Sequence, residues 1–190
     1  RRREAEGRGA APGGMNILTA LRRFLIPRLL ITIWGYLKYG CLISPKAEVE
    51  ITSHLSIGRG SIVGSFTKIK SADGPLQIGR NVEISTGCFL SSFTAGTFIG
   101  DDCMIGPNCS IVGNNYQYDR LDVPIRLQGK ISAKGVRIGD NVWLGAGCVV
   151  LDGADIGAGS ILTPNSVVSG RIPESSIVQG NPGKVIFTRR

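Results

Sequence analysis

A six-residue repeat runs through the chain from residue 45 to the C-terminal region. Cut into sixes, with two short interruptions and one long one, the sequence has Ile, Val or Leu at the first position of sixteen of seventeen units, and Gly at the second position of eight. This period matches neither a helical turn nor a long alternating strand. It fits a three-sided prism in which each face is one short strand and successive coils stack in parallel about 4.8 Å apart. The sequence therefore predicts an all-β fold, a left-handed parallel β-helix, with first positions pointing inward.

The fifth position of each unit is also predicted to point inward and to be small. Four of the five cysteines fall in this column, which makes them core residues and argues against a metal site or a disulfide framework. The sequence contains no C-x-x-C pair, which favours a reducing compartment. The predicted column is Val49, Leu55, Ser61, Thr67, Asp73, Val82, Cys88, Thr94, Cys103, Cys109, Asn115, Val142, Cys148, Ala154, Ser160, Ser166 and Ile172.

Composition and charge agree with this fold and exclude one class of partner. The chain has 27 glycines without a collagen-like period, which suits many tight corners. Residues 1–40 hold eight basic and two acidic residues, a net charge of +6, so only +2 of the total +8 belongs to residues 41–190. A nucleic-acid-binding domain needs a basic face on its folded body. We therefore expect no nucleic-acid partner.

The chain divides into a leader, an arm and one repeat domain. Residues 1–14 resemble disordered or appended sequence, residues 15–44 form a basic and apolar arm, and residues 45–190 form the β-helix with a loop at 112–137. The apolar stretch 24–34 is interrupted by Pro27 and Arg28 and is too short to span a bilayer. Residues 16–40 either lie on a membrane surface as an amphipathic helix or pack, as a helix or an extended arm, on the end of the domain or on a neighbouring subunit. The expected location is cytoplasmic, with peripheral contact at the inner face of the membrane.

The repeat region resembles the hexapeptide-repeat acyltransferases. The similarity rests on IGDNVWLGAGCVVLDGADIGAGSIL, on the closing segment RIPESSIVQGNPGKVI, and on PIRLQG at 124–129 in the loop. It is greatest to the sugar O-acetyltransferases of the maltose, galactoside and surface-polysaccharide types. The resemblance implies a homotrimer with sites between neighbouring prisms, acetyl-CoA as the acyl donor, a sugar or glycan acceptor, and no metal. The loop 112–137 is then expected to close each site.

The same resemblance assigns roles to individual residues. The column of the family's loop histidine falls on Tyr116, a second histidine column falls on Asn114, and Trp143 and Gly145 are expected beside the thioester. The residues expected along coenzyme A are Ala146, Pro164, Ser169, Pro182 and Lys184. Pro164 departs from the family, because proline has no N–H to donate to the pantetheine arm. The loop residues expected to contact the acceptor are Tyr118, Arg120 and Arg126.

The chain departs from the family at the catalytic base. Its only histidine is His54, far from the loop in the repeat register, and a tyrosine phenol is a weak base at neutral pH. Asp119 and Asp122 are alternative bases acting through water. Three functions remain open: an O-acetyltransferase, an impaired trimeric binding or scaffold protein, and an amino-sugar N-acyltransferase, whose amine acceptor needs a base less.

Overall fold

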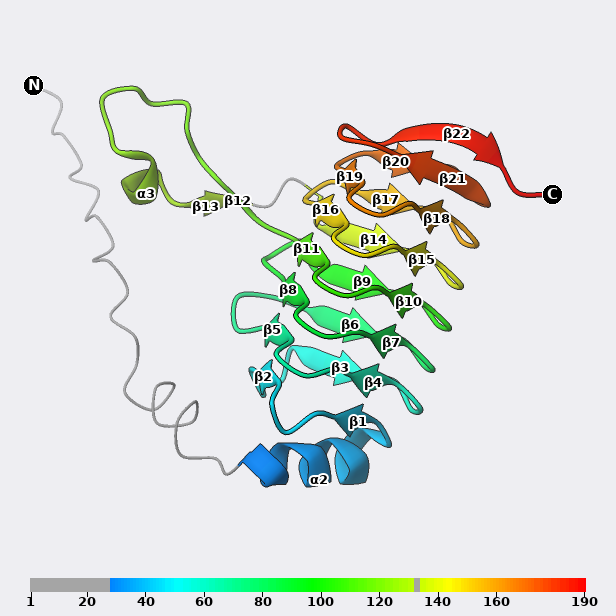
Figure 1. Cartoon of the computed structure of the whole chain (residues 1–190). Helices are drawn as coiled ribbons and strands as arrows, with labels where there is room; N and C mark the ends of the chain where they lie inside the picture. The colour runs from blue at the N-terminus through cyan, green and yellow to red at the C-terminus, as the bar shows by residue number, and fades with distance from the viewer. Residues whose placement is uncertain (1–27, 132–133) are drawn as a thin grey trace, which may run out of the picture.

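The computed structural model describes residues 28–131 and 134–190, and these form the predicted left-handed parallel β-helix. Figure 1 shows the coils stacked in one direction, with helix α2 (Arg28–Tyr39) across one end and the C-terminal strand at the other. Three sheets form the sides of the prism, and we name them A, B and C. Their strands pair in parallel from coil to coil, apart from the last strand of sheet A, which is antiparallel.

The strands are short because the chain must turn a corner after every face. Sheet A contains β1 (Leu42–Ile43), β4 (Ile62–Val63), β7 (Glu83–Ile84), β10 (Met104–Ile105), β15 (Trp143–Leu144), β18 (Ile161–Leu162), β21 (Ser176–Gln179) and β22 (Lys184–Thr188). Sheet B contains β2 (Glu48–Val49), β5 (Lys68–Lys70), β8 (Phe89–Ser91), β11 (Ser110–Val112), β16 (Val149–Leu151) and β19 (Val167–Val168). Sheet C contains β3 (Leu55–Ile57), β6 (Leu76–Ile78), β9 (Thr97–Ile99), β14 (Val136–Ile138), β17 (Asp155–Ile156) and β20 (Arg171–Ile172).

The core consists of the aliphatic side chains at the first position of the repeat. Of the sixteen Ile, Val and Leu residues predicted there, most are buried, and Ile51 is an exception. Registered pairs such as Ile84 and Ile105 lie in adjacent coils, so each side chain packs on its equivalent above and below. The sequence prediction of an inward first position is confirmed.

The prediction for the fifth position is wrong at three of its seventeen residues. Asp73, Thr94 and Asn115 are not buried, because the chain leaves the prism at these points to form loops. Two of the inward positions nearby are taken instead by Leu76 and Thr97, which are fully buried. The remaining members of the column are buried, including its four cysteines.

The small polar residues of this column bond to the next coil. The thiols of Cys109 and Cys148 lie 3.1 and 3.2 Å from the carbonyl oxygens of Gly145 and Thr163. The hydroxyl of Ser61 donates in the same way to the carbonyl of Gly79. All five cysteines are free and buried, and burial raises the pKa of Cys103 to about 11. These thiols therefore act as small hydrogen-bonding core residues.

Helix α2 closes the open end of the prism. Ile31 and Trp34 pack on the core, and Gly35 allows close approach, because a Cβ there would lie 2.9 Å from Ile43. The hydroxyl of Tyr39 donates to the carbonyl of Leu55. In residues 28–131 and 134–190 we find no helix with the length and apolar character to cross a membrane.

Candidate functional site

Four successive coils widen at the corner where sheet B passes to sheet C. The connections there are residues 50–54, 71–75, 92–96 and 113–135, which lie one above another along the prism. The longest carries the antiparallel strands β12 (Asn115–Tyr116) and β13 (Lys130–Ile131) and the short helix α3 (Ile125–Gln128). Figure 1 shows this hairpin projecting away from the prism. We call residues 113–131 the hairpin.

A cavity of about 420 Å³ lies between the base of the hairpin and the outer side of sheet B. Its walls come from four coils, so residues distant in sequence are brought together. The lining residues are Glu50, Lys70, Ala72, Asp73, Phe89, Ser91, Ser92, Val112, Asn114, Tyr116 and Lys130. The cavity therefore combines two aromatic rings with carboxylate, ammonium, amide and hydroxyl groups. We call it the corner cavity.

An ion pair joins the hairpin to a lower coil across this cavity. The Lys130 ammonium lies 2.9 Å from a carboxylate oxygen of Asp73, and this hydrogen bond raises the pKa of Lys130. The Glu50 carboxylate accepts a hydrogen bond from the backbone N–H of Ala72 at 3.2 Å, which supports the same loop. Exposed ion pairs contribute little to stability, so the Asp73–Lys130 pair mainly fixes the position of strand β13 at the base of the hairpin.

Asn114 and Tyr116, the two residues in the family's histidine columns, both line the corner cavity. The amide oxygen of Asn114 lies 3.4 Å from the hydroxyl of Ser91. Tyr116 is 43% exposed and pairs with Lys130 in the register of the hairpin. The hairpin residues described by the structure contain no imidazole, and His54 is exposed at the same corner three coils lower.

The other hairpin residues predicted to bind the acceptor lie outside the cavity walls. The Arg120 guanidinium forms an ion pair with Asp122 at 2.7 Å, and this bond lowers the pKa of Asp122. Asp122 is therefore a weaker base than an ordinary carboxylate. Gln128 closes the tip by bonding the backbone of Arg120 through its amide group. Tyr118 and Arg126 are exposed on this tip and do not line the corner cavity.

The residues expected beside the thioester lie on sheet A and at the corner between sheets A and B. Trp143 points outward from β15 and is 48% exposed. Gly145 is buried. Its N–H donates to the carbonyl of Leu162 in the next coil, so this N–H is not available to a ligand. Ala146 is exposed, and its N–H has no hydrogen-bond partner among the residues that the structure describes. Ala146 is therefore the better donor for a ligand, with Pro164 one coil above and also at the surface.

The remaining coenzyme A candidates lie farther up the prism and are divided between two corners. Pro182 and Lys184 are exposed at the turn from β21 to β22, which is tied to sheet B because Gly183 donates to Val167. Ser169 is exposed at the other edge of sheet B, two coils above the hairpin corner. The structure thus brings Pro182 and Lys184 toward the corner of Ala146 and leaves Ser169 on the hairpin side.

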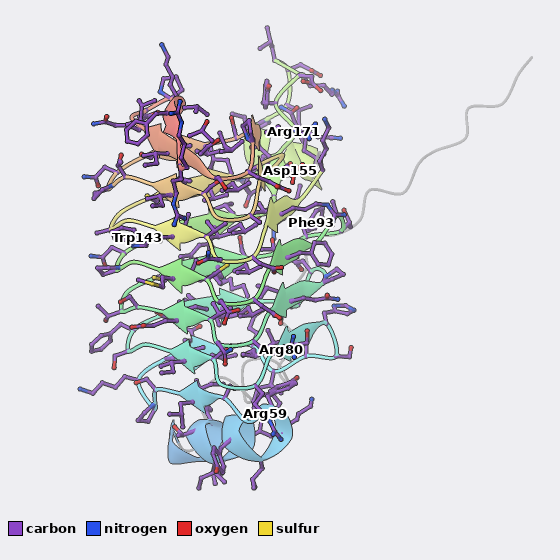
Figure 2. The ribbon with its side chains drawn as sticks, turned by 90° about the vertical axis from the view of Figure 1, so that its right-hand side faces the viewer. Arg59, Arg80, Phe93, Trp143, Asp155 and Arg171 are labelled. Atoms are coloured by element: carbon purple, nitrogen blue, oxygen red, sulfur yellow. The ribbon has the colours of Figure 1, made fainter. Side chains whose placement is uncertain are left out.

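The predicted residues form two separate groups within one chain. The first includes Trp143 and Ala146 near sheet A, and the second includes Asn114 and Tyr116 at the corner between sheets B and C. In Figure 2, Trp143 lies at one side of the prism, whereas Phe93, from the loop just below the hairpin, lies at the other. One chain therefore does not assemble a single site from all the predicted residues.

Asp73, Lys70, Glu50 and Lys130 were not identified by the sequence prediction. Asp73 was assigned to the inward column because the first interruption was placed at residues 75–77, whereas the chain leaves sheet B after Lys70. A signal was nevertheless present, because the interruptions near residues 75, 96 and 112 follow one another by one coil. Interruptions at that spacing must project from the same corner of a prism, and the charged residues beside them become neighbours.

Comparison with known proteins supports the interpretation of the repeat. Residues 135–170 match the family described as bacterial transferase hexapeptide (six repeats), and residues 96–113 match the hexapeptide repeat of succinyl-transferase. These matches identify residues 96–113 and 135–170 as hexapeptide-repeat transferase sequence. In the two matched segments the hexapeptide transferase pattern coincides with buried first positions such as Ile105 and Ile138.

Relatives of this hexapeptide-repeat protein are named as acetyltransferases. It is 32% identical over 170 residues to a probable acetyltransferase of Mycobacterium tuberculosis, covering 90% of this chain but only 56% of the relative. It is 26% identical to the putative lipopolysaccharide biosynthesis O-acetyl transferase WbbJ of Escherichia coli, covering 92% of this chain and 89% of WbbJ. The chain thus spans a little over half of the mycobacterial relative and most of WbbJ.

A solved structure agrees with the fold. The AntD N-acyltransferase from Bacillus cereus, in complex with dTDP and 3-hydroxybutyryl-CoA, aligns with a TM-score of 0.71 at 20% identity. The alignment covers 87% of this chain and 89% of AntD. At this level of identity the likeness concerns the β-helix itself.

Proposed function

We propose that this protein transfers an acetyl group from acetyl-CoA to a hydroxyl group on a sugar of a surface polysaccharide or a glycan precursor. The observation that carries the proposal is the corner cavity, which places sugar-binding chemistry beneath the hairpin of a chain whose relatives are named acetyltransferases. Sugars present hydroxyl groups to carboxylates, amides and ammonium groups, and their C–H faces pack on aromatic rings. The cavity offers all of these, with Asp73, Asn114 and Lys130 beside Phe89 and Tyr116.

The residues proposed to bind the acyl donor, acetyl-CoA, form the other group, near sheet A. Trp143 provides an exposed aromatic surface, and the N–H of Ala146 is free within the described part of the chain to donate a hydrogen bond, which would stabilise a thioester oxygen as negative charge develops on it. Pro164, Pro182 and Lys184 continue along the same side of the prism, where Lys184 supplies a positive charge for a phosphate. This arrangement supports binding of coenzyme A along the outside of the stacked corners.

We propose that the active protein is a homotrimer, because donor and acceptor groups lie on different sides of one prism. A neighbouring copy can bring its hairpin to the donor side, and a closed ring repeats this contact. Apart from Glu83, the outward column of sheet A from β1 to β15 is apolar and supports burial against another chain, since Leu42, Ile62, Met104 and Trp143 are each 46–51% exposed. Three copies of the 20.2 kDa chain give about 60 kDa by light scattering. A particle of 20.2 kDa at micromolar concentration would contradict the shared site.

The role of Asp73 gives a direct test of the acceptor site. Acetyl-CoA-dependent thiol release is measured with a panel of glycans and sugar nucleotides, and Asp73→Asn is expected to lower kcat/KM for the acceptor about tenfold. The KM for acetyl-CoA is expected to stay unchanged, because Asp73 lines the acceptor cavity and is not among the residues proposed to bind coenzyme A. Asp155→Asn is the matched control, since this exposed carboxylate lies on β17 and does not line the cavity. Equal losses in both variants would argue against the corner cavity as the acceptor site.

A second candidate, N-acylation of an amino sugar, is favoured by one observation. The described hairpin has no histidine to deprotonate a hydroxyl group, and an amine presented in its neutral form needs a base less. AntD, which shares the fold, is named an N-acyltransferase. Matched acceptors that differ only in carrying an amine or a hydroxyl at one carbon decide between the two reactions. Thiol release with the amino sugar alone would establish N-acylation.

A further inference from the structure

Helix α2 has apolar side chains on two opposite faces, and the prism covers only one of them. Ile31 and Trp34 pack on the core, whereas Leu30, Ile33 and Leu37 are 49%, 53% and 78% exposed. The exposed residues follow one another at spacings of three and four, so they form one continuous stripe along the helix. A helix that is apolar on all sides is normally covered on all sides. We therefore expect the exposed stripe of Leu30, Ile33 and Leu37 to contact a second surface.

The positive charges near the stripe indicate what kind of surface it contacts. The described part of the arm, residues 28–40, contains Arg28 and Lys38 and no Asp or Glu. The Lys38 ammonium lies 4.9 Å from the rings of Trp34 and Tyr39, at the edge of the helix. A second cation, Arg59, comes from the neighbouring coil and lies beside the helix end at Gly40, as Figure 2 shows. An exposed apolar stripe bordered by cations suits an anionic lipid surface.

We propose that the outer face of α2 docks on an anionic membrane surface, with Leu30, Ile33 and Leu37 entering the interface. Figure 1 shows α2 lying across the end of the prism, and an interfacial helix lies in the plane of the membrane. The stack of coils then stands upright on the bilayer. Because coils are about 4.8 Å apart, the corner cavity, which spans the coils of β2 to β11, extends over about 15 Å of the stack and begins in the coil next to α2. This inference does not depend on the proposed reaction.

The experiment uses the full chain and sedimentation with sucrose-loaded vesicles. Binding is measured to phosphatidylcholine alone and to a roughly 70:30 mixture of phosphatidylcholine and phosphatidylglycerol, across about 50 to 500 mM salt. The double variant Ile33→Glu and Leu37→Glu is expected to reduce partitioning onto the anionic vesicles about tenfold or more. Raising the salt is expected to weaken binding of the unchanged chain several-fold, because surface charges become screened.

The matched control makes the same chemical changes elsewhere on the surface. Leu121 and Ile125 lie on the hairpin tip and are 100% and 57% exposed, so Leu121→Glu with Ile125→Glu alters net charge equally. This control is expected to bind like the unchanged chain, and circular dichroism verifies that both variants are folded. Equal losses in the two double variants, or no loss in either, would overturn the proposal. A change in oligomeric mass confined to the α2 variant would also overturn it, because the stripe would then be covered by a second copy.

Discussion

Replacing Tyr116 by histidine is expected to raise the rate of sugar acetylation about 100-fold or more, because it supplies the base that the described hairpin lacks. Tyr116 lines the corner cavity beside Asn114 and opposite Lys130, so an imidazole at this position can reach an acceptor hydroxyl. The unchanged protein is expected to turn over slowly and to become faster as pH rises, since hydroxide then replaces the missing base. Steady-state thiol release from acetyl-CoA between about pH 6 and 10 measures both effects.

Two further variants separate the role of position 116 from its surroundings. Asn114→His places the same group two residues away, where the present side chain already contacts Ser91, and is expected to give a smaller gain. Tyr116→Phe removes only the hydroxyl and distinguishes a phenolic role from an aromatic contact. If the unchanged protein acetylates a sugar at about 10 per second and Tyr116→Phe has no effect, the missing-base account fails. The base would then have to be sought at Asp73, Glu50 or Asp119.

Substituting Gly58 by alanine is expected to lower the free energy of unfolding by about 2–3 kcal/mol, near the upper end of the usual cost of overpacking. A Cβ at this position would lie 2.4 Å from the carbonyl carbon and oxygen of Gly79 and 2.5 Å from the backbone nitrogen of Arg80. These atoms belong to the next coil, which cannot move away because the N–H of Gly58 donates to Ile78 at 2.8 Å. Equilibrium unfolding in urea measures the loss.

Gly170→Ala is the control for this effect. A Cβ added there meets no heavy atom within 4 Å, and Gly170 does not have a positive φ angle. The substitution is expected to leave the stability unchanged or to raise it slightly, because alanine restricts the unfolded chain more than glycine does. Equal unfolding midpoints for the two variants would show that the stacked corners have room for a methyl group.

The sequence alone was sufficient to predict the prism. A side chain such as Ile105 or Ile138 occupies the interior because its position in a six-residue period repeats with the geometry of the coil. Each side chain at these positions packs on its equivalents in the adjacent coils, so every coil requires an aliphatic residue at the same place. The same reasoning correctly placed four cysteines in the core and the glycines at crowded corners.

Only the tertiary structure decided what the loops bring together. Asp73 and Lys130 are far apart in sequence, and their contact depends on how two loops of different length leave the same corner. The tip of the hairpin shows the same limit, because the ion pair of Arg120 with Asp122 directs that arginine away from the cavity. Irregular loops have no repeat to fix their register, so the position of each side chain follows from contacts that form only in the folded chain.

The exposed side of α2 and the separation of the site residues into two groups were also decided by the tertiary structure. The sequence showed that residues 16–40 are basic and apolar, but the contact of Trp34 with the core was needed to define which side stays exposed. The resemblance to the family likewise pointed to Trp143 and Tyr116, while their separation on the prism became visible only in three dimensions. The periodic interior is determined by sequence because every coil repeats it, and the outer surface is determined by tertiary contacts that occur once.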